Sequence, residues 1–237
     1  EVLRLLNEKY KDIQAVTNAV LSKEGELKGS TSYFANLFIE ELRCLTKENI
    51  RPTIPQEIFS ALKEGTLTKE ELANIYIDFG FANYPNNAKD LLSVKNPMLN
   101  LYLTQLVKSN FKHVNVEEPF VLTGLIDFRK DARFENGLIP DVNSDGLTYA
   151  DNFSLLKKGD GKFSSQDLGL LQRGIPLEFK ENGDINLYTA KEGVRGFYLG
   201  RDLYLSARYE DLGNSGGTGR VRATKNFSSE HLEKIVD

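Results

Sequence analysis

The spacing of apolar residues changes near residue 115, and this change constrains the fold more than any other feature of the chain. Before it, apolar residues recur at steps of three and four, the period of a helix with one buried face. After it, short apolar runs alternate with Gly, Asn and Asp, a pattern typical of strands joined by tight turns. We therefore predict the α+β class, with a helical N-terminal part followed by a strand-rich, mainly antiparallel C-terminal part. We expect a helical bundle or array over 1–112 and an α+β part over 113–237, with one continuous unit as the alternative.

The N-terminal part contains several helix signals. Pro55 suits the first turn of a helix, and Thr68 stands three residues before Glu71, the spacing of a capping box. We expect helices over residues 1–21, 30–45, 55–62, 68–77 and 97–108. Cys44 is the single cysteine, which excludes an internal disulfide and a multi-cysteine zinc site. We expect Cys44 to be a buried structural thiol on the second of these helices.

The C-terminal part contains hairpin signals. PFVLTGLIDF over 119–128 resembles a strand that Gly124 interrupts. We expect IPLEFK over 175–180 and INLYT over 185–189 to form a hairpin that turns at Asn182-Gly183. GVRGFYLG over 193–200 and LYLSARY over 203–209 predict a second hairpin. RVRAT over 220–224 predicts a last strand, and SSEHLEKIV over 228–236 a short closing helix.

Charge and hydropathy exclude two classes of partner. The formal net charge of the 237-residue chain is -4, whereas a general nucleic-acid binder needs a basic face to neutralise phosphates. No apolar run approaches the ~18–20 residues that span a bilayer, so we expect no membrane insertion. Because the chain begins at Glu1 rather than Met, we expect a processed protein or a module of a larger one.

DVNSDGLTYADN over 141–152 has the pattern of a calcium loop. Ca²⁺ takes several oxygen ligands, which such a loop supplies from positions 1, 3 and 5, from a backbone carbonyl at 7 and from a carboxylate at 12. Gly146 at position 6 permits the sharp turn, whereas position 12 is an amide with a carboxylate beside it. We therefore expect one Ca²⁺ to be held by Asp141, Asn143, Asp145, Leu147, Asp151 and Asn152.

The second half of this loop recurs further along the chain. DGLTYADNFSLLKK over 145–158 aligns without gaps on DGKFSSQDLGLLQR over 160–173. Residues 141–173 resemble the dockerin family, whose paired EF-hand-like calcium loops are each followed by a helix with a Leu pair. The offset of the second copy places Leu156 and Lys158 at its first two ligand positions, so only the first copy has the ligands. A calcium loop favours an extracytoplasmic location. The alternative is a metal-free turn, with Asn152 and Asp167 as helix N-caps.

Acidic residues around the junction of the two parts suggest an enzyme as one alternative. A hydrolase can use one carboxyl group as an acid and a second as a base. The candidates are Glu117, Glu118, Asp127, Asp131 and Asp141.

Aromatic and basic residues of the C-terminal strands suggest a binding surface as the other alternative. They are Tyr188, Phe197, Tyr198, Tyr204, Tyr209, Arg195, Arg201 and Arg208. Alternation along LYLSARY places Tyr204, Ser206 and Arg208 on one face and Leu203, Leu205, Ala207 and Tyr209 on the other. The face with the Leu and Ala residues is the core face, so we expect the polar aromatic face to look outward. Such a face can receive a glycan or another protein.

Taken together, these patterns favour a non-catalytic structural or interaction module that one calcium ion stabilises. The hydrolase and the glycan- or protein-binding module remain the alternatives.

Overall fold

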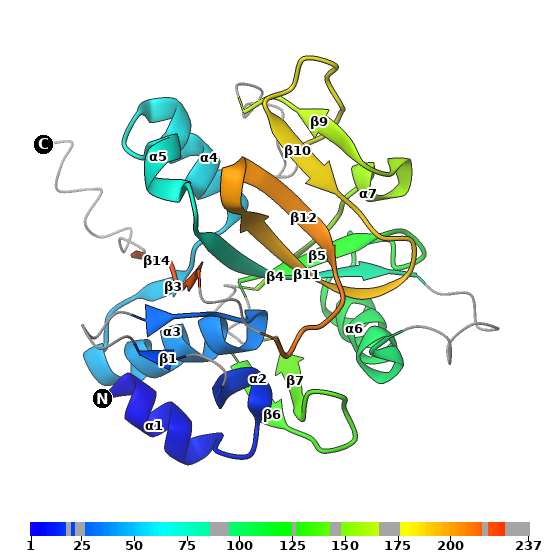
Figure 1. Ribbon diagram of the computed structural model, residues 1–237. Coiled ribbons are helices and arrows are strands. Elements are labelled where there is room, and N and C mark those ends of the chain that lie inside the picture. Colours follow the sequence, from blue (N-terminus) through cyan, green and yellow to red (C-terminus); the bar gives the residue numbers. More distant parts are fainter. Residues whose placement is uncertain are drawn as a thin grey trace, which may run out of the picture.

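Figure 1 shows the computed structural model, in which a large sheet has helices packed on both of its faces. The structure describes residues 1–17, 20–21, 27–85, 95–124, 127–142, 148–165, 176–214 and 218–225. The class is α+β with mostly antiparallel pairing, as the sequence predicts. No helix in these ranges is long and apolar enough to cross a membrane.

The helices of the described residues are short except for two. They are α1 (Val2–Lys9), α2 (Gln14–Thr17), α3 (Ser32–Thr46), α4 (Pro55–Glu64), α5 (Lys69–Leu72), α6 (Pro97–Asn110) and α7 (Leu155–Lys158), with the 3-10 turn η2 (Arg201–Leu203). The expected starts at Thr31, Pro55 and Pro97 are confirmed: Thr31 caps α3, and the two prolines open α4 and α6.

The strands form one large sheet and three small pairs. They are β1 (Val20–Leu21), β2 (Leu27–Lys28), β3 (Ile50–Pro52), β4 (Tyr76–Tyr84), β5 (Phe120–Thr123), β6 (Asp127–Lys130), β7 (Leu138–Asp141), β8 (Tyr149–Asn152), β9 (Gly161–Phe163), β10 (Ile185–Tyr188), β11 (Gly193–Gly200), β12 (Tyr204–Tyr209), β13 (Gly219–Arg220) and β14 (Ala223–Lys225). The large sheet has the order β8-β5-β4-β11-β12-β10-β9, and β13 also pairs with β4. The pairs β10–β12 and β13–β4 are parallel, and the other neighbours in this sheet are antiparallel.

Strand β4 lies in the middle of the large sheet and corrects one of our predictions. The capping box at Thr68 and Glu71 is confirmed, but helix α5 ends at Leu72, and Ile77 lies in β4. Ala73 already leaves the helical conformation (ψ 136°), and Asn74 then adopts a left-handed backbone (φ 68°) before β4 begins. Strand β4 then pairs with β5 and β11, so strands from both sides of residue 112 share one sheet. Whether either side folds alone stays a prediction.

A second correction concerns the hairpin expected at Asn182-Gly183. Residues 176–180 form no strand, and β10 pairs with β9 and β12 instead. Because β9 already occupies the edge of β10 where IPLEFK was expected, IPLEFK has no strand partner there. The β11–β12 hairpin is confirmed, and RVRAT is divided between β13 and β14. The closing helix expected over 228–236 lies outside the described residues.

The N-terminal helical region differs from the prediction in two further details. The single helix expected over 1–21 is divided into α1 and α2, with the following residues of that range in part outside the described residues. Cys44 is exposed, contrary to the buried position that we expected. It lies in the last turn of α3, which extends past the core, and the neighbouring Leu45 is 45% exposed.

Two hydrophobic cores lie on opposite faces of the large sheet. One contains side chains of α4, α5 and α7, including Phe59 against Phe163. The other contains side chains of α1, α2, α3 and α6, including Tyr33 against Phe81. Burial of these aromatic side chains supplies a large part of the stabilisation, at ~25 cal/mol per Å² of apolar surface. The second core also positions the first turn of α3 against β4.

Candidate functional site

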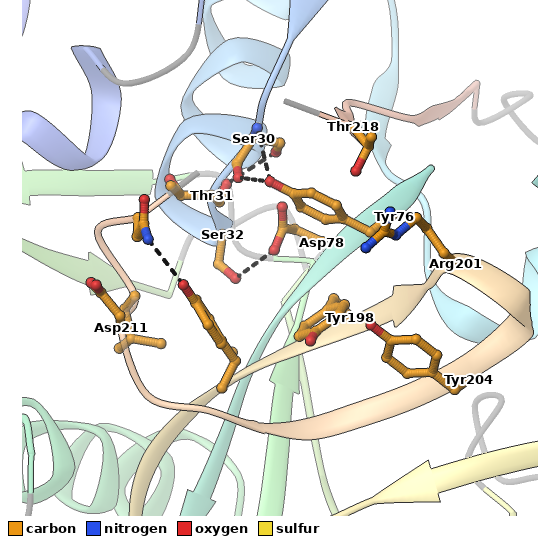
Figure 2. A pocket seen from close by; sticks show the side chains of 14 residues that line it. Ser30, Thr31, Ser32, Tyr76, Asp78, Tyr198, Arg201, Tyr204, Asp211 and Thr218 are labelled. Carbon is orange, nitrogen blue, oxygen red and sulfur yellow. Dashed lines mark hydrogen bonds between the residues drawn. The ribbon is translucent and has the colours of Figure 1, made fainter. Parts of the chain in front are cut away.

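A partly enclosed hollow with an aromatic wall lies where α3 begins, and we call it the tyrosine cavity. The cavity has a volume of about 230 Å³. It is lined by residues 30–32 at the start of α3, by strands β4, β11 and β12, by the turn η2, and by Asp211, Leu212, Asn214 and Thr218. Figure 2 shows these side chains converging from segments far apart in the sequence. An engineered cavity of about 150 Å³ binds benzene. The tyrosine cavity is therefore large enough for a molecule with one ring.

A β-bulge turns Asp78 toward the cavity. Two consecutive pairs, Phe197 with Gly80 and Tyr198 with Asp78, leave Phe79 of β4 without an opposite residue. Gly80 has φ +151°, and a Cβ there would overlap the backbone oxygen of Leu122, so only glycine fits. With this extra residue, the side chain of Asp78 points away from the core that Phe79 fills.

The carboxyl group of Asp78 has few partners. Ser32 Oγ lies 3.4 Å from Asp78 Oδ1, and it also lies 2.9 Å from the backbone oxygen of Gly80, to which it donates. Oδ2 is buried and has no hydrogen-bond partner among the described residues. Burial raises the pKa of Asp78 from 3.8 to about 6, although the hydroxyls of Ser30 and Ser32 oppose the shift. Asp78 is thus a carboxylate at neutral pH, and no described residue places a cation in an ion pair with it.

Four tyrosine side chains line the cavity, and we call Tyr76, Tyr198, Tyr204 and Tyr209 the tyrosine cluster. The ring of Tyr198 is at its centre, with centroids 5.9 Å from Tyr76, 6.1 Å from Tyr204 and 6.5 Å from Tyr209. All three pairs have the edge-to-face geometry that aromatic rings prefer. The cluster therefore holds its shape by its own contacts.

Backbone contacts fix two of these rings further. The hydroxyl of Tyr76 donates to the backbone oxygen of Ser30 at 2.6 Å, which joins β4 to the residues before α3. The rings of Tyr76 and Tyr204 lie against Gly219 and Gly200, where a Cβ would overlap them. Burial raises the pKa of Tyr198 to about 12, so its hydroxyl stays neutral.

Among the described residues that line the cavity, three side chains are charged: the acids Asp78 and Asp211 and the base Arg201. The wall therefore carries one net negative charge at neutral pH. In Figure 2 the ring of Tyr76 is drawn between Asp78 and Arg201.

An open groove continues from the cavity along the outer side of β12 and β10. Tyr198, Tyr204 and Tyr209 line both, and Tyr188 and Arg208 line the groove alone. Tyr188 and Tyr204 are in edge contact at 5.3 Å. Ligand contacts can thus extend from the enclosed cavity onto an aromatic surface.

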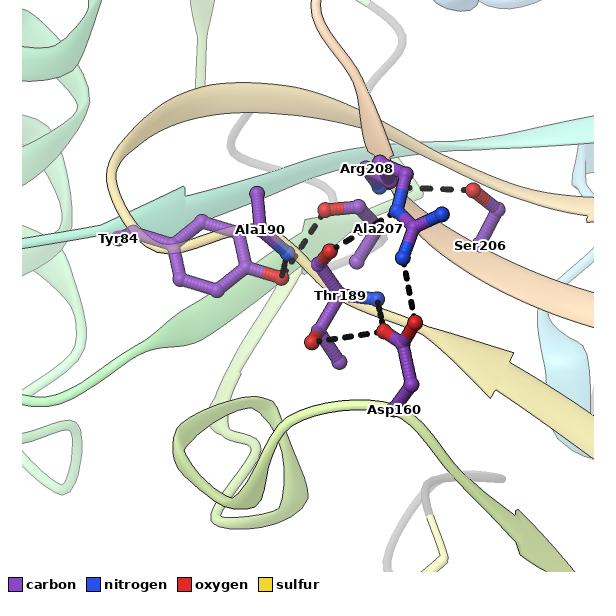
Figure 3. Close-up of polar contacts among 7 residues, drawn as sticks. All are labelled: Tyr84, Asp160, Thr189, Ala190, Ser206, Ala207 and Arg208. Atoms are coloured by element: carbon purple, nitrogen blue, oxygen red, sulfur yellow. Dashed lines mark hydrogen bonds and ion pairs between the residues drawn. The ribbon is translucent and has the colours of Figure 1, made fainter.

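Polar contacts hold the end of β12 in place (Figure 3). The guanidinium of Arg208 lies 5.2 Å from the centre of the Tyr188 ring, forms an ion pair with Asp160, and donates through Nε to the backbone oxygen of Thr189 at 3.2 Å. Asp160 accepts in turn from the backbone N–H of Thr189 at 2.8 Å. Because Asp160, Thr189 and Arg208 satisfy one another, we interpret this cluster as structural.

Tyr204, Ser206 and Arg208 line the same groove on β12, as predicted for one polar face, but Ser206 is buried and Tyr209 departs from the prediction. Leu203, Leu205 and Ala207 are buried, as expected. Tyr209 was expected on their side, but it contacts Tyr198 and is 41% exposed. A second bulge is the reason: between the pairs Gly196–Tyr209 and Tyr198–Ser206, β12 has one residue more than β11. One extra residue reverses the side to which the next side chain points.

The expected calcium ligands lie in different elements or outside the described residues. Asn143, Asp145 and Leu147 lie outside. Asp141 ends β7 and lies 3.8 Å from Arg129, and Asp151 and Asn152 lie in β8.

The two β8 residues already have partners. Asp151 Oδ1 lies 3.4 Å from His113 Nε2. Asn152 Oδ1 accepts from the backbone N–H of Asn115 at 2.7 Å. The expectation that Asn152 caps the following helix is wrong, because Ser154 is the N-cap of α7. In the described part of the chain, no three acidic, His or Cys side chains are grouped to hold a metal ion.

The structure places three of the five carboxylates suggested for a hydrolase in separate ion pairs, and Asp141 with Arg129 is one of them. Glu118 pairs with Lys157 at 2.8 Å, and Asp131 with Arg133 at 2.5 Å. Asp127 and Asp141 are also brought together, because they are opposite residues of the β6–β7 pair. Of the five, none lines the tyrosine cavity in the described chain.

Sequence reasoning identified four aromatic or basic residues of the cavity and missed the others. Tyr198, Tyr204, Tyr209 and Arg201 belong to the predicted aromatic strands. Asp78 was missed, since an isolated Asp in an apolar stretch matches no motif. Comparison of the chain with known protein families, with curated proteins and with solved structures finds no match in any of the three.

Proposed function

We propose that this chain is a non-catalytic binding module that takes up a small ring-containing ligand in the tyrosine cavity. The observation that carries the proposal is the combination of an enclosed aromatic wall with a carboxyl group that has few partners. Ligand sites are typically apolar hollows with a small number of polar groups that fix orientation. The tyrosine cavity has this composition.

Binding is supported better than catalysis by the chemistry of the wall. The described lining residues include no histidine, cysteine or lysine, which leaves Asp78 and Asp211 as the candidate general bases of this part of the chain. The hydroxyl of Thr31, which donates to Ala15 O, and that of Tyr76 are engaged in backbone hydrogen bonds. A two-carboxylate mechanism would need Asp78 to work with Asp211, the second acid that lines the cavity.

The groove beside the cavity supports a second candidate, a glycan or protein partner. Its support is the exposed Tyr209 and the Tyr188 ring with the guanidinium of Arg208 above it. Tyr and Arg are enriched where proteins bind partners. A glycan with one ring in the cavity would use both surfaces.

Calcium at residues 141–152 also stays a proposal. Asp127 and Asp141 stand opposite one another on β6 and β7, where like charges repel unless a cation is near. One calcium ion at this loop would relieve that repulsion. Arg129, 3.8 Å from Asp141, relieves part of it without metal.

The experiment for the tyrosine cavity uses two substitutions at Gly196. A Cβ at Gly196 would meet its nearest neighbour, Leu212, at 3.8 Å, so Gly196→Ala fits without a clash. Gly196→Leu projects further into the cavity, which Gly196 lines, and fills part of it. Both variants are first checked for folding by circular dichroism and thermal melting.

The two variants are then compared with wild type by ligand-detected NMR. The panel contains benzylamine, benzyl alcohol, benzoate and methyl glucoside at millimolar concentration. We expect at least one compound to bind wild type and Gly196→Ala, and to lose binding in Gly196→Leu. If no compound binds wild type, or if Gly196→Leu binds as well as wild type, the tyrosine cavity is not the site.

A further inference from the structure

We propose that the ligand of the tyrosine cavity is a protonated organic amine, whose ammonium group pairs with Asp78 while its ring lies against the tyrosine cluster. This inference rests on the proposed function and names its ligand class. The geometry that carries it is a half-buried carboxylate at an aromatic wall, with no cation placed beside it by the described residues.

Among the described residues, no cation forms an ion pair with Asp78. From α3 it faces the hydroxyl of Ser32, at the long distance of 3.4 Å, and across the sheet it lies opposite Tyr198. Arg201 of η2 and Asp211 also line the cavity, and the ring of Tyr76 is drawn between Asp78 and Arg201 in Figure 2. A buried charge is costly unless it is paired, so a ligand cation gains most from this position.

Other ligand classes fit this position less well. An anion would be repelled by Asp78 and Asp211. A neutral hydroxyl gives one hydrogen bond but leaves the charge uncompensated. Ca²⁺ and Mg²⁺ need six or more oxygen ligands, and the described residues offer no such group here. An ammonium group supplies both the charge and N–H donors.

The tyrosine cluster adds a second attraction for the same class. The face of an aromatic ring carries negative charge density and attracts a cation within about 6 Å of its centre. Tyr198 is in contact with Tyr76, Tyr204 and Tyr209, so several rings surround one small volume. The hydroxyl of Tyr198 is neutral, because burial raises its pKa to about 12. The rings of the tyrosine cluster and the carboxylate of Asp78 therefore both favour a positively charged ligand.

Benzylamine and benzyl alcohol test the inference, because they share size and shape and differ in charge. Isothermal titration at pH 7.5 should give a dissociation constant at least tenfold lower for benzylamine than for benzyl alcohol, and no binding of benzoate. Asp78→Asn should raise the dissociation constant of benzylamine at least tenfold and change that of benzyl alcohol by less than about twofold. Lowering the pH to 5.0 should weaken benzylamine about tenfold in wild type, because most Asp78 carboxyl groups then carry a proton.

The outcomes separate this inference from the proposed function. If benzyl alcohol or benzoate binds as tightly as benzylamine and Gly196→Leu abolishes that binding, the cavity is a site but the amine is wrong. If no compound binds, both fail. If benzylamine binds equally well to wild type and Gly196→Leu, it binds elsewhere and the inference is overturned. Should Asp78→Asn fail to fold, the pH dependence in wild type decides between charge and shape.

Discussion

Replacing Asp78 by Asn should change how the stability of the protein depends on pH. In the folded chain the pKa of Asp78 is raised by burial to about 6, against 3.8 for a free side chain. The carboxyl group therefore releases its proton more readily in the unfolded chain, and stability falls as the pH rises between these two values. At 1.36 kcal/mol per pH unit, the full loss is about 3 kcal/mol.

The measurement is urea unfolding of wild type and Asp78→Asn at pH 5 and pH 8, followed by circular dichroism. We expect the free energy of unfolding of wild type to fall relative to Asp78→Asn by about 1.5 kcal/mol between these pH values, because about half of the loss is already present at pH 5. Asn keeps the size of the side chain, so the change with pH isolates the charge.

Asp131→Asn is the matched control. The hydrogen bond from Arg133 lowers the pKa of Asp131 to about 2, so this carboxylate is fully ionised at both pH values. Its difference from wild type should stay constant between pH 5 and 8. If the difference in free energy of unfolding between wild type and Asp78→Asn is also the same at pH 5 and pH 8, the reasoning is refuted, because Asp78 would then have an ordinary pKa.

Three further predictions concern the bulge, the end of β12 and calcium. Gly80→Ala should lower the free energy of unfolding by more than about 3 kcal/mol or prevent folding, because its Cβ would overlap the backbone oxygen of Leu122. The control Gly196→Ala should stay within about 1 kcal/mol of wild type in urea unfolding. Tyr84→Phe should lower the free energy of unfolding by about 1–3 kcal/mol in chemical denaturation. The buried hydroxyl donates to the backbone oxygen of Ala207 at 2.9 Å and accepts from the backbone N–H of Ala190 at 3.0 Å. Equal stability of the variant and wild type would show that water replaces the hydroxyl. Calcium at 1–5 mM should raise the melting temperature of wild type but not of Asp145→Ala, and no shift in wild type would exclude the loop as a calcium site.

The helices were predictable because their signals are local. The row of apolar residues along α3 and the prolines that open α4 and α6 lie within the helices that they specify. The hydroxyl of Thr31 accepts from the backbone N–H of Phe34, a contact between residues three apart. Such contacts can be inferred from a short stretch of sequence.

The centre of the sheet could not be predicted in the same way. Strand β4 follows a valid capping box, and its apolar residues fit a helix or a strand equally well until Asn74 is known to be left-handed. Two bulges then decide which way Asp78 and Tyr209 point, and both depend on pairing with β11. A bulge moves side chains from one face to the other without a sequence pattern that shows it.

The cavity itself depends on contacts between distant residues. Ser32 and Asp78 are 46 residues apart, as are Ser30 and Tyr76. The aromatic composition of β11 and β12 indicated a binding surface, but on the open face alone. Only the folded chain places the first turn of α3 beside that face and encloses part of it.

The most direct test of the central claim is to locate a bound amine on the protein. Intermolecular nuclear Overhauser effects between benzylamine and the tyrosine rings would be recorded at pH 7.5, with the ring protons of Tyr76, Tyr188 and Tyr198 assigned. We predict contacts from benzylamine to Tyr76 and Tyr198, which both line the tyrosine cavity. Contacts to Tyr188 alone, which lines the open groove, or the absence of any contact would contradict the account.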